Sequence, residues 1–365
     1  MGHRSMGVEE EFLLVDPRDG SARALAAAAL GGCPGGVESE VEAELQLQQI
    51  ETNTEPCISL SDLGRQVRHA RGQAAEAARS VGAEIAAMGT APLPTETSIT
   101  PDRRYRRMRE RFGLMAEEQL TCGCHIHVDV ESDEEGVAVL DRMRPWLPTL
   151  LALSANSPFW QGKDSAYASY RAQVWSRWPS AGPTELFGSA ETYHDTVRAM
   201  TETQTVLDTG MIYFDARLSQ RYATVEIRVA DVCLHPDDVV LLAALARALV
   251  QTAEREWRNG AAVAPMRLEL IRLAGWRASR SGLEDELLDP RTMRPAPAIN
   301  VIDGLLEHVR DALEDSGDQA DVGELRDALL NRGNGARQQR EMFRENGRLA
   351  DVVAECARRT APTGS

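Results

Sequence analysis

Apolar and polar residues recur along the chain in patterns that predict strands in its first two thirds. Residues 8–15 predict one strand, and strict alternation of apolar and polar positions predicts two more at 124–130 and 223–231. Apolar residues near helical spacing predict a long helix over residues 60–88. A proline and two aspartates, typical of a helix start, precede a second predicted helix at residues 239–257.

The last third of the chain has a different pattern, dominated by predicted helices. The segment 289–297 contains three prolines, and we expect it to be a loop. Amphipathic or helix-like patterns follow at residues 299–313, 323–330 and 338–358. Strands early and helices late favour an α+β fold over a doubly wound sheet. We expect one continuous domain over residues 1–365, with a catalytic sheet and helices in 1–260 and a mostly helical part in 261–365.

The composition is that of a folded, acidic protein. There are 40 basic and 56 acidic residues, which gives a formal net charge of −16. That charge disfavours nucleic acid and anionic membranes as partners, because both require a basic surface. We therefore expect small-molecule partners, and homo-oligomers stay an open alternative. Lys163 is the only lysine, so a basic side chain that contacts phosphate should be an arginine, which suits bidentate recognition.

The chain also lacks the marks of a membrane or secreted protein. Its longest apolar stretches, at residues 147–155 and 239–250, are shorter than the roughly 20 residues of a membrane helix. The first six residues contain no apolar signal core. No Cys-x-x-Cys pair occurs among Cys33, Cys57, Cys122, Cys124, Cys233 and Cys356. We expect these to be reduced thiols in a cytoplasmic protein.

The strand predicted at residues 8–15 carries three consecutive glutamates. Alternation places Glu9 and Glu11 on one face and Glu10 on the other, together with Phe12. Carboxylates within an apolar strand are costly to bury unless a cation compensates them. The alternative is a solvated strand end, which this segment alone does not exclude.

The strand predicted at residues 124–130 carries a second polar row. His125, His127 and Asp129 share one face, opposite apolar residues on the other. Two imidazoles and a carboxylate in a row are typical of metal ligands. The alternative is that the histidines are satisfied structural residues.

Two further pairs of charged residues are weaker on their own. Glu226 and Arg228 share a face of the strand predicted at 223–231, an arrangement that a half-exposed strand would also give. Glu44 and Glu51 are seven residues apart, so they align on a helix but need a bulge to align on a strand. Surface carboxylates are the alternative for this pair.

Taken together, these strands indicate a divalent metal site that meets polyphosphate. Mg²⁺ prefers oxygen ligands and keeps substrate phosphates in its shell, and a histidine in the set would also suit Mn²⁺. Arginines neutralise the charge on a transferring phosphoryl group. The chain contains neither the glycine-rich P-loop motif nor the catalytic loop of protein kinases.

On these motifs the chain resembles the type 2 glutamate–cysteine ligases, or carboxylate–amine ligases, of the glutamine synthetase-like superfamily. The resemblance extends over nearly the whole chain. The matching stretches are residues 7–17, 122–130, 144–148, 153–160, 167–171, 222–231, 276–280 and 335–340. It implies a curved antiparallel sheet, with helices packed behind it, that holds ATP and two or three divalent ions.

The resemblance also implies roles for single residues. Five of them correspond to metal ligands: Glu9, Glu11, Glu51, His125 and Glu226. The resemblance also offers Glu44 as a further carboxylate ligand, outside these five. Arg228 corresponds to the contact with the γ-phosphate, and Arg171 to an arginine near the transferring phosphate or the substrate carboxylate. Arg217 and Arg221 are expected to contact the nucleotide, although Leu218 replaces a proline that is usual in the family.

The activity that the resemblance implies is ATP-dependent γ-glutamyl ligation. Glutamate would be activated as an acyl phosphate, with cysteine as the expected acceptor and another amine as the alternative. Two rival classes remain: a metal-dependent amidohydrolase, and a nucleotide-binding protein without catalysis on the same fold. The amidohydrolase requires further histidines on strands, and the later ones, His194, His235 and His308, lie in no predicted strand.

Overall fold

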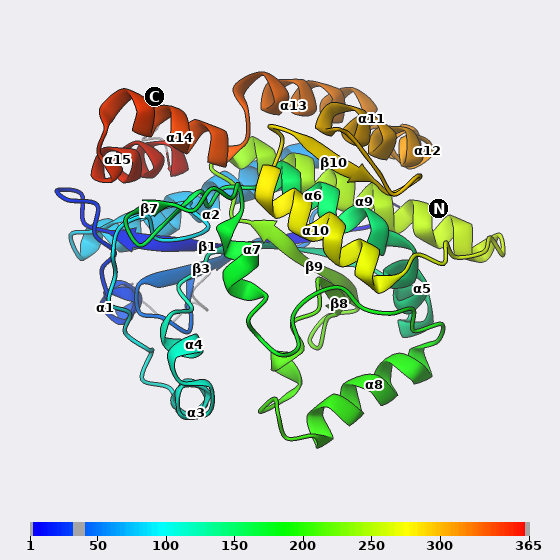
Figure 1. Ribbon diagram of the computed structural model, residues 1–365, viewed down its shortest axis with the longest axis horizontal. Helices are drawn as coiled ribbons and strands as arrows, with labels where there is room; N and C mark the ends of the chain where they lie inside the picture. The colour runs from blue at the N-terminus through cyan, green and yellow to red at the C-terminus, as the bar shows by residue number, and fades with distance from the viewer. Residues whose placement is uncertain (1–2, 32–40, 362–365) are drawn as a thin grey trace.

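The centre of the protein is an open antiparallel sheet, seen edge-on in the computed structural model (Figure 1). The structure describes residues 3–31 and 41–361. Within them the sheet runs in the order β2-β3-β1-β5-β9-β8, and β4 also pairs with β1. The strands are β1 (Met6–Val15), β2 (Val41–Ala43), β3 (Gln49–Asn53), β4 (Glu84–Ala86), β5 (Gly123–Asp129), β8 (Ala216–Leu218) and β9 (Thr224–Asp231). The α+β class and the three predicted strands are thereby confirmed.

Helices cover one face of this sheet and bury its apolar side chains. They are α2 (Leu60–Ser80), α5 (Asp133–Met143), α6 (Leu147–Ser154) and α9 (Pro236–Arg258). Phe12, Ile126 and Ile227 lie on this side and are fully or almost fully buried. Glu10 shares the side, where its carboxylate pairs with the buried Arg71 of α2 at 2.6 Å. The predicted alternation of β1 is therefore correct, and its odd-numbered glutamates point to the opposite face.

Most C-terminal elements pack on the outside of this helical layer (Figure 1), whereas α15 packs against the sheet itself. Helix α10 contacts α6, while α12 and α13 contact α9 and α15 contacts β4. The bounds are α10 (Leu268–Ser281), α11 (Ala298–His308), α12 (Arg310–Ser316), α13 (Gln319–Arg332), α14 (Gly335–Asn346) and α15 (Leu349–Thr360). This part of the chain is mostly helical, as predicted.

The opposite face of the sheet carries a second, more open set of helices. In Figure 1, α3 (Arg103–Phe112) and α4 (Leu114–Glu117) extend below one side of the sheet, and α8 (Ala190–Glu202) extends below the other. Helix α7 (Tyr170–Trp175) lies between them. The remaining elements are α1 (Ala26–Gly31), the 3₁₀ turns η1 (Arg144–Trp146) and η2 (Thr209–Met211), and the hairpin β6 (Phe159–Trp160) and β7 (Lys163–Asp164).

Two predicted segments, a helix and a loop, differ from the structure. The helix predicted at 60–88 ends at Ser80, because Gly82 turns the chain with φ of +75° and residues 84–86 form β4. The loop predicted at 289–297 belongs instead to a hairpin of β10 (Glu286–Asp289) and β11 (Arg294–Pro297). In a two-stranded sheet both strands are edge strands, and some of their backbone N–H groups have no partner in the sheet. Proline, which lacks an N–H, is therefore tolerated in β11.

The helices predicted at 299–313 and 338–358 are each split in two. Val309 separates α11 from α12, and Gly347 separates α14 from α15 with φ of +71°. Periodicity does not reveal these breaks, because the apolar face continues into the next helix. The helices predicted at 239–257 and 323–330 lie within α9 and α13.

Two expectations about the environment of the chain can be compared with the structure. No helix of the described residues is long and apolar enough to cross a membrane. Cys57, Cys122, Cys124, Cys233 and Cys356 are free thiols and are buried. The sixth cysteine, Cys33, lies outside the described residues.

Candidate active site

A cleft with a volume of about 1280 Å³ opens on the face of the sheet that α2, α5, α6 and α9 leave free. Polar side chains of β1, β3, β5, β8 and β9 form its floor, and residues of α3 and α7 line its walls. A cleft of this size can hold a nucleotide and a second small substrate. Eight of the predicted site residues line it: Glu9, Glu11, Glu51, His125, Arg217, Arg221, Glu226 and Arg228.

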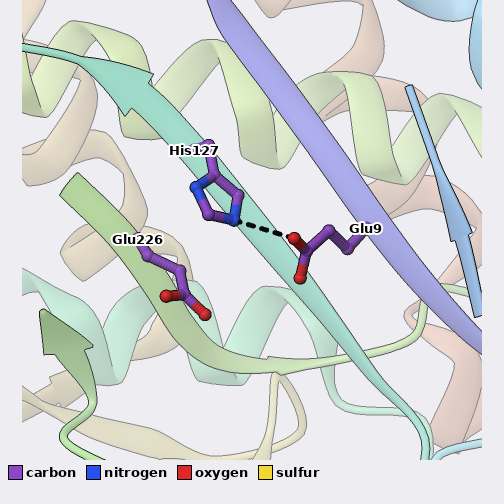
Figure 2. A group of neighbouring side chains, drawn as sticks. All are labelled: Glu9, His127 and Glu226. Carbon is purple, nitrogen blue, oxygen red and sulfur yellow. Dashed lines mark hydrogen bonds and ion pairs between the residues drawn. The ribbon is translucent and has the colours of Figure 1, made fainter. Parts of the chain in front are cut away.

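Glu9, His127 and Glu226 form a group that we call the first acid cluster (Figure 2). One ligand atom from each lies within 4.8 Å of the others. His127 Nε2 is 3.1 Å from Glu9 Oε1, while its Nδ1 is 2.9 Å from the hydroxyl of Thr224. Two carboxylates and an imidazole held in this way can bind a divalent metal.

The histidine in this cluster is His127, whereas the resemblance pointed to His125. The register explains the difference, because β5 has an irregularity between Cys124 and Ile126. His127 is therefore directly opposite Glu226, while His125 has no register partner on β9. Alternation along the strand had already placed both histidines on the cleft side.

His125 nevertheless contacts the same carboxylate. Its Nδ1 is 3.1 Å from Glu9 Oε2, and its buried Nε2 has no hydrogen-bond partner among the described residues. Burial and the nearby Arg228 lower the pKa of His125 to about 4, so the imidazole is neutral at pH 7. Neutral imidazole with a free nitrogen is the form that binds a metal. Burial raises the pKa of Glu9, but the two histidines outweigh it and hold that pKa well below its usual range.

Two arginines neutralise the Glu226 end of the first acid cluster. Arg217 Nε donates to Glu226 Oε2 at 2.6 Å, and Arg228 forms an ion pair with the other carboxylate oxygen. Burial raises the pKa of Glu226, but the charges of Arg228 and Arg217 outweigh burial and lower this pKa to about 2. Arg228 also lies 5.7 Å from the ring centroid of Trp175, which fixes its orientation. Two arginines next to a carboxylate of this cluster suit a phosphate group.

Glu11, Glu44 and Glu51 form a second acid cluster, again with ligand atoms within 4.8 Å of one another. Glu44 follows β2, and the β2–β3 hairpin returns the chain so that Glu51 is paired with Glu11. Burial and the charge of Glu44 raise the pKa of Glu11 to about 7. Burial and the three neighbouring glutamates raise the pKa of Glu51 well above its usual range. Three carboxylates in one place fit a hard divalent cation.

Arg221 and Arg171 occupy different positions from the paired arginines. Arg221 is exposed and lines the edge of the cleft, with its backbone N–H donated to Ser219. Arg171 is buried and does not line the cleft. Its Nη1 is 4.0 Å from Asp231, and a Cβ atom at Gly123 would be 2.3 Å from its Nη2. The N–H of Gly123 in turn donates to the Glu11 carboxylate at 2.6 Å. By packing against Gly123, Arg171 therefore helps to fix the position of Glu11.

Other candidate ligands lie elsewhere. Asp129 does not line the cleft, although alternation placed it in the row of His125 and His127. His194 is in α8, His235 precedes α9 and His308 ends α11, so these three histidines do not extend the metal site. The donor set thus consists of carboxylates with one or two histidines, unlike that of a histidine-rich hydrolase.

Comparison with known proteins decides the family. Residues 5–355 match the description "Glutamate-cysteine ligase family 2 (GCS2)". The chain belongs to this family. It is therefore an enzyme of the ligase class, and the resemblance inferred from the motifs is confirmed.

Relatives in this family align over almost their full length. A protein of Streptomyces avermitilis, provisionally named glutamate–cysteine ligase 2-1, is 55% identical over 359 residues, which are 98% of this chain and 99% of the relative. A provisionally named glutamate–cysteine ligase 2 of Streptomyces coelicolor is 56% identical with the same coverage.

Solved structures of low sequence identity share the fold of this family member. A bifunctional glutathione synthetase from Pasteurella multocida has a TM-score of 0.70 at 16% identity, covering 98% of this chain and 52% of that one. The glutamate–cysteine ligase of Francisella tularensis, solved in complex with AMP, has a TM-score of 0.69 at 11% identity, covering 99% and 89%. Both confirm the expected architecture of an antiparallel sheet with helices behind it.

Proposed function

We propose that the protein is an ATP-dependent ligase that joins the γ-carboxylate of glutamate to an amine, with cysteine as the expected acceptor. The observation that carries this proposal is the pair of acid clusters on one sheet face, with Arg217 and Arg228 beside them. Such a floor suits a metal–polyphosphate substrate next to a carboxylate substrate. The names of the family relatives and the AMP bound to the Francisella ligase support the same substrates.

The donor chemistry of the clusters fits Mg²⁺, and the histidine of the first cluster also suits Mn²⁺. Glu9, His127 and Glu226 would hold one ion, with His125 as a further ligand, and Glu11, Glu44 and Glu51 would hold another. When bound, these ions supply positive charge next to the phosphates and the substrate carboxylate. The raised pKa of Glu51 supports this assignment, because crowded carboxylates require a compensating cation.

The arginines of the chain would carry the remaining charge. Arg228 and Arg217, both fixed by Glu226, would contact the phosphoryl group as it transfers, and Arg221 would contact the nucleotide at the edge of the cleft. Arg171 would act indirectly, by fixing Gly123 and hence Glu11.

A free carboxylate does not acylate an amine, because its leaving group would be oxide. In the proposed reaction a γ-carboxylate oxygen attacks the γ-phosphorus of ATP and ADP leaves. The amine nitrogen then attacks the acyl carbon, phosphate leaves with the original carboxylate oxygen, and the nitrogen loses a proton. Holding both reactants on one rigid sheet lowers the entropic part of the barrier.

The test is ADP release by the full chain with Mg²⁺, ATP, glutamate and a panel of amines, compared with ATP alone. Glutamate labelled with ¹⁸O in its γ-carboxylate should transfer label to phosphate. Cleavage of ATP to AMP, or unlabelled phosphate, would reject the acyl phosphate. Turnover with another amine but not with cysteine would keep the ligase and change its acceptor, and nucleotide binding without turnover would leave a non-catalytic homologue.

A further inference from the structure

Besides His125 and Arg228, two side chains that line the cleft contain a buried polar atom without a hydrogen-bond partner among the described residues: Gln119 at Oε1 and Trp178 at Nε1. Both side chains line the cleft, although they are only 4% and 2% exposed. Leaving such a group unsatisfied costs about 1–3 kcal/mol, so native proteins usually provide a partner. A substrate in the cleft can be that partner.

The two side chains come from chain segments that lie next to each other. Glu118 and Arg177, which directly precede them, form an ion pair of 2.6 Å at the surface. The rings of Phe112 and Tyr213, with centroids 5.1 Å and 5.5 Å from that of Trp178, hold the indole in place. We call Gln119 and Trp178 the head-group subsite.

The head-group subsite adjoins the second acid cluster. Gln119 Nε2 donates to the hydroxyl of Thr121 at 2.8 Å, and Gln49 Nε2 donates to the carbonyl of Thr121 at 2.9 Å. Gln49 precedes Glu51 by two positions on β3, so both side chains point into the cleft. Two hydrogen bonds thus join the subsite to the strand that carries Glu51 of the second acid cluster.

The chemistry of the subsite matches the head of an amino acid. The free carbonyl of Gln119 accepts a hydrogen bond, as an α-amino group requires, and the indole N–H of Trp178 donates one, as an α-carboxylate requires. Both groups are neutral and held by their neighbours, so they select by hydrogen bonding and shape. A site of this kind rejects analogues that lack either group.

We propose that Gln119 and Trp178 bind the α-amino and α-carboxylate groups of the acid substrate while its side-chain carboxylate reaches the second acid cluster. This inference rests on the proposed function, and it names the residues that select the acid. The amine then enters from elsewhere in the cleft and does not contact the subsite.

Two conservative variants test the proposal. Trp178→Phe keeps an aromatic ring but removes the N–H, and Gln119→Met keeps the length but removes the amide, both its carbonyl and its hydrogen bond to Thr121. Each should raise KM for glutamate about tenfold or more, with KM for ATP and for the amine unchanged and kcat within about threefold. Gln46→Met is the matched control, because Gln46 is fully buried and also has an unpartnered Oε1 but does not line the cleft. It should leave all three KM values unchanged.

A binding measurement separates failure of this inference from failure of the proposed function. Labelled glutamate is dialysed to equilibrium against the full chain with Mg²⁺ and ADP, where no turnover occurs. Weaker binding by both variants, with circular dichroism spectra like the wild type, would support the subsite even if no amine gave turnover. Binding equal to the wild type, or a higher KM for the amine in place of glutamate, would overturn it.

Discussion

The two acid clusters lie side by side on one sheet face, yet they balance their charges in different ways. In the first, two histidines contact Glu9 and two arginines contact Glu226. In the second, Glu11, Glu44 and Glu51 face one another, and their negative charge is offset mainly by the buried Arg171 and the N–H of Gly123. The pKa values follow this contrast, since that of Glu226 falls to about 2 while that of Glu11 rises to about 7.

The comparison shows which cluster needs a cation most. The first cluster is already neutralised by side chains, so it can keep its geometry and present arginines to a phosphate. The second concentrates negative charge, and a cation relieves the repulsion directly. We therefore expect loss of charge in the first cluster to damage catalysis and stability together, and loss of charge in the second mainly to change metal dependence.

The largest expected effect is that of Glu226→Gln on ligation. The substitution keeps the shape but removes the charge that fixes Arg217 and Arg228 and that would hold a metal. We expect kcat/KM to fall by roughly 10²-fold or more in the ADP-release assay, with the fold retained by circular dichroism. Glu202→Gln, at the exposed end of α8, is the control. Turnover above about half of the wild-type value would remove Glu226 from the catalytic machinery.

The next effect concerns stabilisation by Mg²⁺. At about 100 times its dissociation constant a ligand of the native state adds roughly 2.7 kcal/mol, or about 3 °C in Tm for a chain of this length. Glu51→Gln should lose most of this shift between EDTA and Mg²⁺ in a thermal melt. An undiminished Mg²⁺ shift in the variant would show that the second acid cluster is not the main cation site.

Without a metal the two clusters should respond in opposite directions. Glu51→Gln relieves repulsion among buried carboxylates, so the free energy of unfolding in EDTA should rise by about 1 kcal/mol or less. Glu226→Gln breaks a buried ion pair with two arginines, so the same quantity should fall. Urea unfolding of both variants in EDTA measures this. Changes of the same sign would contradict the difference between the clusters.

The smallest expected effect is that of Arg221→Ala. Arg221 is exposed, so water and salt screen its charge, unlike that of the partly buried Arg217. We expect KM for ATP to rise about threefold at low salt, less at high salt, and kcat to stay unchanged. A large fall in kcat would place Arg221 next to the transferring phosphoryl group.

Much of the floor of the cleft could be predicted from three short segments. Alternation alone placed Glu9, Glu11, both histidines, Glu226 and Arg228 on polar strand faces, and the structure brings these faces together. Glu44 and Glu51 were noticed only as a pair of carboxylates seven residues apart, and the family resemblance then gave Glu51 the role of a metal ligand. Strand boundaries were accurate because a buried apolar face leaves little freedom in register.

Other features depended on contacts that a local pattern does not contain. His127 rather than His125 faces Glu226 because of the irregularity in β5. Gln119 and Trp178 lie outside every predicted strand, and their only sequence signal is the residue type. The end of α2 and the splits at Val309 and Gly347 were missed because apolar spacing continued across them.

The sequence by itself determined the fold class, the family and the composition of the floor, because alternation in a strand fixes which side chains share a face. The tertiary structure alone decided how those side chains are grouped. Glu44 and Glu51 meet Glu11 through a hairpin, Arg171 packs against Gly123, and the segments of Gln119 and Trp178 meet although they are far apart in the chain. The physical reason is that charge balance and hydrogen bonding depend on distances across strands, which local periodicity does not encode.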